Sequence, residues 1–117
     1  MQTVLATPVF LRQAKEVGLD DDEIAEIVGV LASNPMLGDV IPGTGGARKL
    51  RHGLAGKGKS GGLRTIHFFG GTDIPVFLLA VYAKNTTANL TKAERNQLSD
   101  YLPKIAAEYR KARKRRS

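Results

Sequence analysis

The sequence predicts an α+β protein in which helices pack on a small, mostly antiparallel sheet. Apolar residues repeat at helical spacing near both ends of the chain, whereas the middle holds short segments rich in β-branched and aromatic residues. Turn signals separate these segments and give the order β-α-α-β-β-β-α. With 117 residues, of which 42% are hydrophobic, residues 1–117 are expected to form a single domain.

The N-terminal third is expected to hold one strand and two helices. Thr3–Ala6 is a short apolar run, and Thr7-Pro8 supplies an N-cap followed by proline at the first helical position. This helix ends at Gly18. The second helix opens on Asp20–Glu23, whose negative charges favour the positive end of the helix dipole, and ends at Asn34-Pro35. These acids are interpreted as helix caps, because their spacing fits no EF-hand loop.

The middle of the chain predicts a loop and then three strands. The loop covers Gly38–Gly46, and Gly70–Asp73 is typical of a turn between the last two strands. The strands are expected at Arg48–His52, Leu63–Phe69 and Val76–Ala83.

The C-terminal part predicts a long helix and a basic tail. Thr91–Glu94 forms a capping box that opens the helix, and Pro103 is expected to kink or divide it. Residues 110–117 read RKARKRRS and are expected to fray or to be disordered without a partner. The apolar face of the helix consists of Leu98, Leu102, Ile105 and Tyr109.

Charge is concentrated in two basic blocks. The net charge is −5 over residues 1–39, +6 over residues 40–72, zero over residues 73–103 and +6 over residues 104–117. No acidic residue lies between Val40 and Thr72, where the bases are Arg48, Lys49, Arg51, Lys57, Lys59 and Arg64. Cations on a strand, beside glycines that let a partner approach the backbone, are typical of a phosphate site. A nucleic acid is therefore the expected partner rather than a membrane, because no apolar amphipathic anchor accompanies the tail.

Composition also predicts where the protein works. The chain has no cysteine, which excludes disulfides and thiolate metal sites. It has neither the start of a signal peptide nor a run of about 18 apolar residues. We therefore expect a cytoplasmic protein.

Gly53–Ser60 matches the phosphate-binding pattern G-x-x-x-x-G-K-S. A P-loop needs a buried strand before it and a helix after it, so that the helix N-terminus meets the phosphates. Here the basic segment ARKLRH precedes the pattern and the β-rich LRTIHFF follows it. We therefore reject nucleotide hydrolysis and expect these lysines to contact the phosphates of a polymer.

Strand alternation predicts which side chains can share a face. The ends of neighbouring strands can present Arg64, Tyr82 and Lys84 beside Lys57 and Lys59 of the intervening loop. Such a cluster can hold a scissile phosphate and stabilise the charge that develops on it during transfer. Tyr82 is also the aromatic residue placed to stack on an unpaired base.

The same alternation gives Tyr82 the face of Leu78 and Ala80 and puts His67 on the face opposite the basic cluster. His52, at a strand end near the basic loop, is the better candidate for an acid or a base. The two histidines lack the acidic partner that a metal site would need. A solvated hairpin with solubilising lysines is the alternative interpretation, but it leaves the strand arginine unexplained.

Three long segments resemble the HigB branch of the RelE/ParE toxin superfamily of bacterial toxin–antitoxin modules. They lie within residues 34–98 and read NPMLGDVIPGTGGARKLR, GKGKSGGLRTIHFF and FLLAVYAKNTTANLTKAERNQL. The resemblance implies the β-α-α-β-β-β-α fold and a ribosome-dependent mRNA endonuclease that uses no metal or other cofactor. Such enzymes promote attack of the RNA 2′-hydroxyl on its own 3′-phosphate. The implied partner is a HigA-like helix-turn-helix antitoxin, through which alone the toxin meets operator DNA.

The resemblance also assigns roles to residues. Lys57 and Lys59 would position the backbone or act on the 2′-hydroxyl, and Arg64 would stabilise the pentavalent phosphate. Tyr82 and Lys84 would orient a base or supply a proton. Further RNA contacts are expected from Arg48, Lys49, Arg51 and His52.

Two departures from the pattern leave the general base open. Asn85 stands where relatives have an arginine, and Asn89–Thr91 stand where relatives have a tyrosine. Two other functions are compatible with the residues: a non-catalytic toxin like ParE, which binds a protein such as gyrase, and a basic nucleic-acid-binding module that uses the tail alone.

Overall fold

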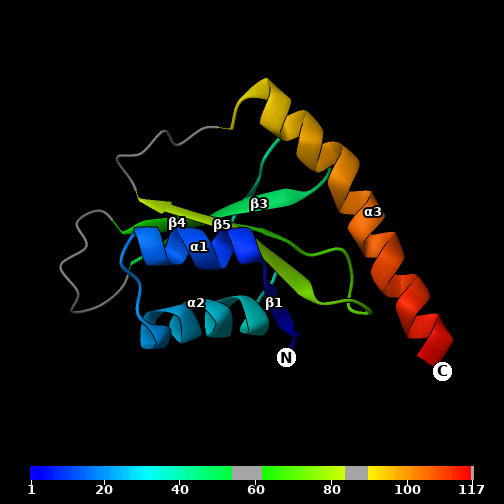
Figure 1. Ribbon diagram of the computed structural model, residues 1–117, viewed down its shortest axis with the longest axis horizontal. Helices are drawn as coiled ribbons and strands as arrows, with labels where there is room; N and C mark the ends of the chain where they lie inside the picture. The colour runs from blue at the N-terminus through cyan, green and yellow to red at the C-terminus, as the bar shows by residue number, and fades with distance from the viewer. Residues whose placement is uncertain (54–61, 84–89, 117) are drawn as a thin grey trace.

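The computed structural model has a five-stranded mixed sheet and three helices, so the predicted α+β fold is confirmed (Figure 1). It describes residues 1–53, 62–83 and 90–116. The sheet has the spatial order β1-β5-β4-β3-β2, and only the β1–β5 pair is parallel. The strands are β1 (Val4–Ala6), β2 (Asp39–Val40), β3 (Ala47–His52), β4 (Leu63–Phe68) and β5 (Val76–Ala83). The helices are α1 (Pro8–Glu16), α2 (Asp21–Ser33) and α3 (Lys92–Arg116).

Local capping explains where the first two helices begin. The Thr7 hydroxyl accepts the amide of Phe10 at 3.3 Å, and Pro8 occupies the first turn of α1. At α2, the Asp20 carboxylate accepts the amide of Glu23 at 2.8 Å, and the Glu23 carboxylate accepts the amide of Asp20 at 2.9 Å. Gly18, at φ 80°, makes the turn between the helices in a conformation that favours glycine.

The two faces of the sheet carry two separate apolar clusters. Helices α1 and α2 cover one face, called here the α1/α2 face, and α3 crosses the other, called the α3 face. The first cluster consists of Phe10, Ala14, Leu19, Ile27, Leu31, Leu63, Leu78 and Val81. The second consists of Ala47, Ile66, Phe68, Ile74, Phe77, Leu79, Leu102 and Ala106. Each large side chain buried in this way stabilises the fold by about 1.5–3 kcal/mol.

A β-bulge in β5 changes which residues share a face. Ile66 pairs with Ala80 and His67 pairs with Leu78, so Leu79 is an extra residue in β5. Leu79 packs in the α3 cluster, whereas Leu78 belongs to the α1/α2 cluster. The predicted placement of Leu78 on the face of Tyr82 is therefore wrong, because simple alternation cannot count the bulged residue.

Helix α1 completes the edge of β5 beyond the short strand β1. The amide and the hydroxyl of Thr7 donate to the carbonyl of Leu78 at 3.1 and 3.0 Å. The side-chain oxygen of Gln13 accepts the amide of Val81 at 3.1 Å, where a longer β1 would have supplied a backbone carbonyl. This contact holds α1 beside the second half of β5.

The loop predicted at Gly38–Gly46 contains the short strand β2, which sequence patterning missed. Asp39 and Val40 pair with Lys49 and Arg48 of β3. The following turn is closed by Thr44, whose hydroxyl donates to the carbonyl of Ile41 at 2.7 Å and accepts the amide of Ala47 at 3.0 Å.

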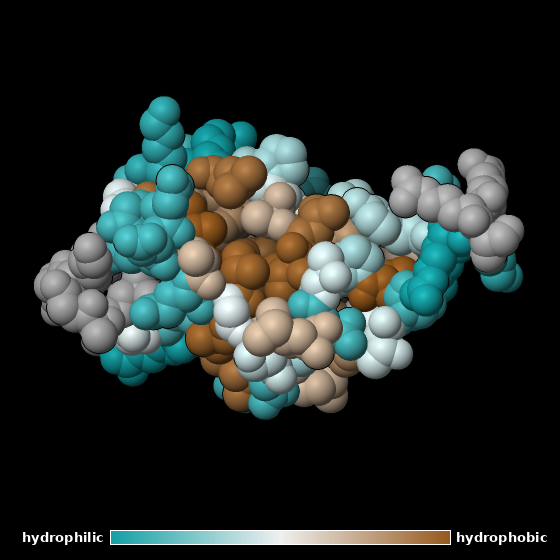
Figure 2. Space-filling model, turned by 90° about the horizontal axis from the view of Figure 1, so that it is seen from below, coloured by the Kyte–Doolittle hydropathy of each residue, from teal (hydrophilic) through white to brown (hydrophobic). Residues whose placement is uncertain are grey.

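The C-terminal helix is longer than expected. Pro103 lies inside α3 without dividing it, and the helix continues to Arg116. Residues 110–116, which were expected to fray, continue this helix in the structure, and Arg110 donates to the two carboxylate oxygens of Asp73 at 2.7 and 3.2 Å and to the carbonyl of Gly70 at 2.8 Å. Arg113 also donates to the carbonyl of Asp73. Figure 2 shows the hydrophilic end of α3 extending from the more apolar centre of that view.

Candidate functional site

Three polar side chains form a row across the α3 face. In the strand register, Arg64 of β4 lies directly opposite Arg51 of β3 on one side and Tyr82 of β5 on the other. Directly opposed side chains in antiparallel strands have Cβ atoms about 4.5–5.5 Å apart. The register therefore aligns the Cβ atoms of two arginines and a tyrosine at one end of the sheet. Of the predicted catalytic set, the row contains Arg64 and Tyr82.

Arg64 carries unused hydrogen-bonding capacity inside this row. The residue is half-buried, and its Nη1 atom is buried with no hydrogen-bond partner among the residues that the structure describes. A buried donor without a partner costs stability, and so do like charges directly opposed in neighbouring strands. An anion bound between Arg51 and Arg64 would remove both penalties. A phosphate oxygen matches the guanidinium fork.

Tyr82 lies where it can act as a hydrogen-bond donor. Partial burial raises the pKa of its phenol, and the positive charge of Arg64 opposes that rise. The phenol is therefore protonated at neutral pH. This state suits donation to a ligand or stacking better than it suits a general base.

The remaining predicted site residues divide into three groups. Lys57, Lys59 and Lys84 lie outside the described residues. Lys49 pairs with Ile66 on the α3 face, together with Arg51 and Arg64.

Arg48 and His52 belong to the third group, because strand alternation puts them on the α1/α2 face, away from Arg64. Arg48 donates to the carbonyls of Met36 and Gly38, at 3.0 Å each, and so holds the loop before β2. In the structure, Arg48 thus stabilises the backbone of the loop that contains Met36 and Gly38.

The two histidines are buried on the α1/α2 face, not in the cationic row. A ring nitrogen of His52 lies 2.8 Å from the Thr65 hydroxyl, and one of His67 lies 3.0 Å from the carbonyl of Pro35. Burial lowers the pKa of both, with further lowering of the His52 pKa by His67. The Pro35 carbonyl raises the pKa of His67, and the charge of Arg48 lowers it. Neither ring contacts the row that contains Arg64.

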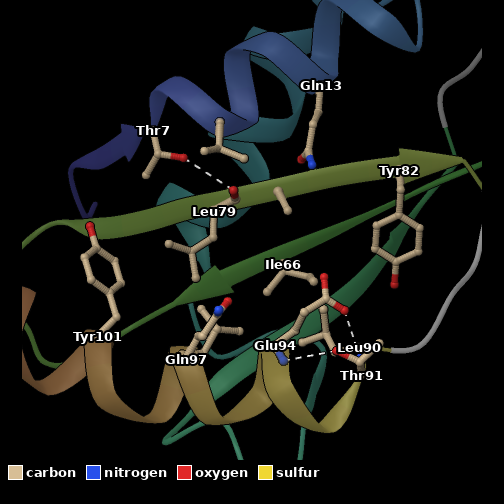
Figure 3. A pocket seen from close by; sticks show the side chains of 13 residues that line it. Thr7, Gln13, Ile66, Leu79, Tyr82, Leu90, Thr91, Glu94, Gln97 and Tyr101 are labelled. Atoms are coloured by element: carbon tan, nitrogen blue, oxygen red, sulfur yellow. Dashed lines mark hydrogen bonds between the residues drawn. The ribbon is translucent and has the colours of Figure 1, made fainter.

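A groove of about 760 Å³ adjoins the row and was not predicted from the sequence. It lies between α1 and the first turns of α3, over β4 and β5 (Figure 3). Tyr82 belongs to both the row and the groove. The capping box of α3 could have indicated one wall of this groove. Gln97 and Tyr101 follow Glu94 by three and seven positions, so the three side chains lie on the same side of the helix.

The described residues hold no group of three or more histidine, cysteine or acidic side chains that could bind a metal ion. In the same part of the chain, no helix combines the length and apolar character needed to cross a membrane.

The fold is that of a small α+β protein with a row of two arginines and a tyrosine at one end of its sheet. The family described as "RelE toxin of RelE / RelB toxin-antitoxin system" matches residues 2–116. The chain therefore belongs to the RelE toxin family. It is the toxin of a toxin–antitoxin pair, and an antitoxin is its partner.

Proposed function

We propose that this toxin is a ribosome-dependent mRNA endonuclease of the HigB type, which inhibits translation by cutting mRNA without a metal ion. The observation that carries the proposal is the Arg51–Arg64–Tyr82 row, in which a buried guanidinium nitrogen of Arg64 has no hydrogen-bond partner within residues 1–53, 62–83 and 90–116. In addition, the sequence between Val40 and Thr72 contains no acidic residue. Such a row fits a phosphate group better than a protein surface.

In this proposal the scissile phosphate sits between the two arginines. The 2′-oxygen of the RNA attacks the adjacent phosphorus, the bond to the 5′-oxygen of the next nucleotide breaks, and a 2′,3′-cyclic phosphate remains. Arg64 stabilises the negative charge of the pentavalent phosphate, an effect that preorganised donors supply efficiently. One of Lys57 and Lys59, in its neutral form, takes the 2′-hydroxyl proton while the other positions the backbone, and Lys84 or Tyr82 gives a proton to the leaving 5′-oxygen.

The ribosome supplies the orientation that the row lacks. The described site has no acid–base pair in contact with Arg64, because both histidines lie on the opposite face of the sheet. Holding one codon in a fixed position can contribute roughly 7–11 kcal/mol through effective molarity. The second partner is a HigA-like helix-turn-helix antitoxin, and the neighbouring reading frame is the place to look for it.

The test compares Arg64→Ala with the wild-type toxin on ribosomes programmed with a defined mRNA, with cleavage mapped by primer extension. We expect cleavage to fall about 10²–10³-fold, as when a donor to a developing charge is removed. Arg12→Ala is the matched control, because Arg12 forms an exposed ion pair with Glu16 at 3.7 Å on α1. Thermal unfolding of each variant shows whether the fold is retained.

The cleavage assay, run beside an assay of gyrase inhibition, separates the competing functions. Full cleavage by folded Arg64→Ala would remove Arg64 from the site. Equally rapid cleavage of free mRNA at matched concentration would reject ribosome dependence. A wild-type toxin that cuts no RNA but inhibits gyrase would favour a non-catalytic ParE-like toxin.

A further inference from the structure

We infer that the groove between α1 and α3 binds a single RNA nucleobase and that Glu94 and Gln97 read the hydrogen-bonding edge of that base. The inference rests on the proposed function, since the base in question is the one next to the phosphate held by Arg64. It assigns base preference to the first two turns of α3, a part of the molecule outside the cationic row.

The groove is continuous with the row. Tyr82 lies opposite Arg64 and also lines the groove, and Ile66, the next residue of β4 on the same face, forms part of the groove floor. Alternate residues of a strand are about 6–7 Å apart. One nucleotide can therefore place its phosphate at Arg64 and its base in the groove.

Charge decides which part of the nucleotide enters. Glu94 is the one charged side chain among the described residues that line the groove. A phosphate would be repelled by this carboxylate, whereas an amino group on the edge of a base would donate to it. Glu94 already accepts the backbone amide of Thr91 at 2.9 Å, but a carboxylate can accept several hydrogen bonds.

The side chains of α3 point into the groove from one side. Figure 3 shows Glu94, Gln97 and Tyr101 rising from the helix toward the sheet, with Tyr82 at the other end. The amide of Gln97 can donate and accept, so the pair offers more than one hydrogen bond to a base edge.

The floor and the size of the groove suit a flat ring. Leu79 and Leu98 provide apolar surface, and Tyr82 and Tyr101 provide aromatic rings at its two ends. Proteins that recognise unpaired RNA bases combine aromatic stacking with hydrogen bonds to the base edges. The volume of about 760 Å³ lies within the range of about 300–1,000 Å³ that is usual for small-ligand sites.

Two variants change the side chains that contact the base, Glu94 and Gln97, while preserving the helix. Glu94→Gln keeps the capping box, since glutamine also serves at that position, but it adds a donor to an acceptor-only group. Gln97→Ala removes the amide. Asn96→Ala is the matched control, because Asn96 is an exposed amide on the same turn that does not line the groove.

The experiment measures cleavage on ribosomes programmed with mRNAs that differ at each base of one codon. The wild-type toxin is expected to prefer a base that presents an amino group. Gln97→Ala should reduce this preference by about fivefold or more, which corresponds to the loss of one base-specific contact. Glu94→Gln should shift the preference toward bases that present a carbonyl oxygen, and Asn96→Ala should match the wild type.

Three results would overturn the inference. One is a wild-type toxin with no base preference, and another is an unchanged preference in both groove variants at normal cleavage rates. The third is loss of antitoxin binding by the groove variants with base preference intact, which would make the groove an antitoxin site. Absence of any cleavage by the wild type is a different result, because it rejects the proposed function on which the inference rests.

Discussion

The two faces of the sheet show how one small domain divides stability from ligand binding. The α1/α2 face is closed: Phe10, Ile27 and Leu31 are fully buried there, and its two histidines are hydrogen-bonded within the protein. The α3 face is closed only in part, and it exposes the cationic row and the groove. Helix α3 is fastened near its C-terminal end by Arg110 and Asp73, so its first turns border a groove rather than a packed core.

The largest expected effect comes from breaking the closed face. Phe10→Ala deletes a fully buried ring and is expected to lower the free energy of unfolding by about 3–5 kcal/mol. Val9→Ala, one residue earlier in α1, removes a side chain that is 44% exposed at the groove, and it should change stability by less than about 0.5 kcal/mol. Chemical denaturation measures both. Similar losses from the two changes would show that the faces are equally important for stability.

Acidic pH should also lower the free energy of unfolding through the closed face, by less than the Phe10→Ala substitution does. His52 and His67 have pKa values lowered by burial below the ordinary value of 6.5, so between those values the unfolded chain binds more protons than the folded one. The contribution of the two histidines to the free energy of unfolding should therefore be constant above about pH 6.5 and should decrease as the pH drops below that value.

The control for acid destabilisation is Asp73→Asn on the other face. The hydrogen bond from Arg110 lowers the pKa of Asp73 below its ordinary value of 3.8, so this carboxylate contributes stability that is lost only at more acidic pH. Asn at this position should lower the free energy of unfolding by a constant amount above about pH 4, so that the slope in the histidine region is unchanged, and should remove the further loss at more acidic pH. A stability curve of the wild type that is flat from pH 7.5 to 5 would contradict the assignment to the histidines.

Sequence patterning predicted the closed face and most of the element boundaries because the signals are local. The N-caps at Thr7 and Asp20 and the capping box at Thr91 act within three or four residues. The helical end of α3 depends instead on Asp73, which is 37 residues away from Arg110 in the chain. A helix stabilised by such a contact cannot be read from the charge of RKARKRRS alone.

The open face was predicted in part. Alternation correctly put Arg64 and Tyr82 on one face, but the bulge at Leu79 puts Leu78 and the residues before it on the opposite faces from those that alternation assigns. The opposition of Arg51 and Arg64 was not predicted, because the long connection over residues 53–62 does not fix the strand register. The groove was missed because it joins residues of α1, β5 and α3 that only the tertiary fold brings together.

The smallest expected effect, that of Arg51→Gln, is the most direct test of the difference between the two faces of the sheet. If the row is built for a ligand and not for stability, Arg51→Gln should relieve the repulsion with Arg64 and raise the free energy of unfolding by about 0.2–1 kcal/mol, while it lowers mRNA cleavage. Arg12→Gln on α1 should do the reverse, with a loss of a few tenths of a kcal/mol and unchanged cleavage, because it breaks the exposed pair with Glu16. Denaturation at low ionic strength, where screening is weakest, together with the programmed-ribosome assay measures both changes. A loss of stability in Arg51→Gln would mean that the two arginines are held in place by favourable packing, and the row would then no longer require an anion.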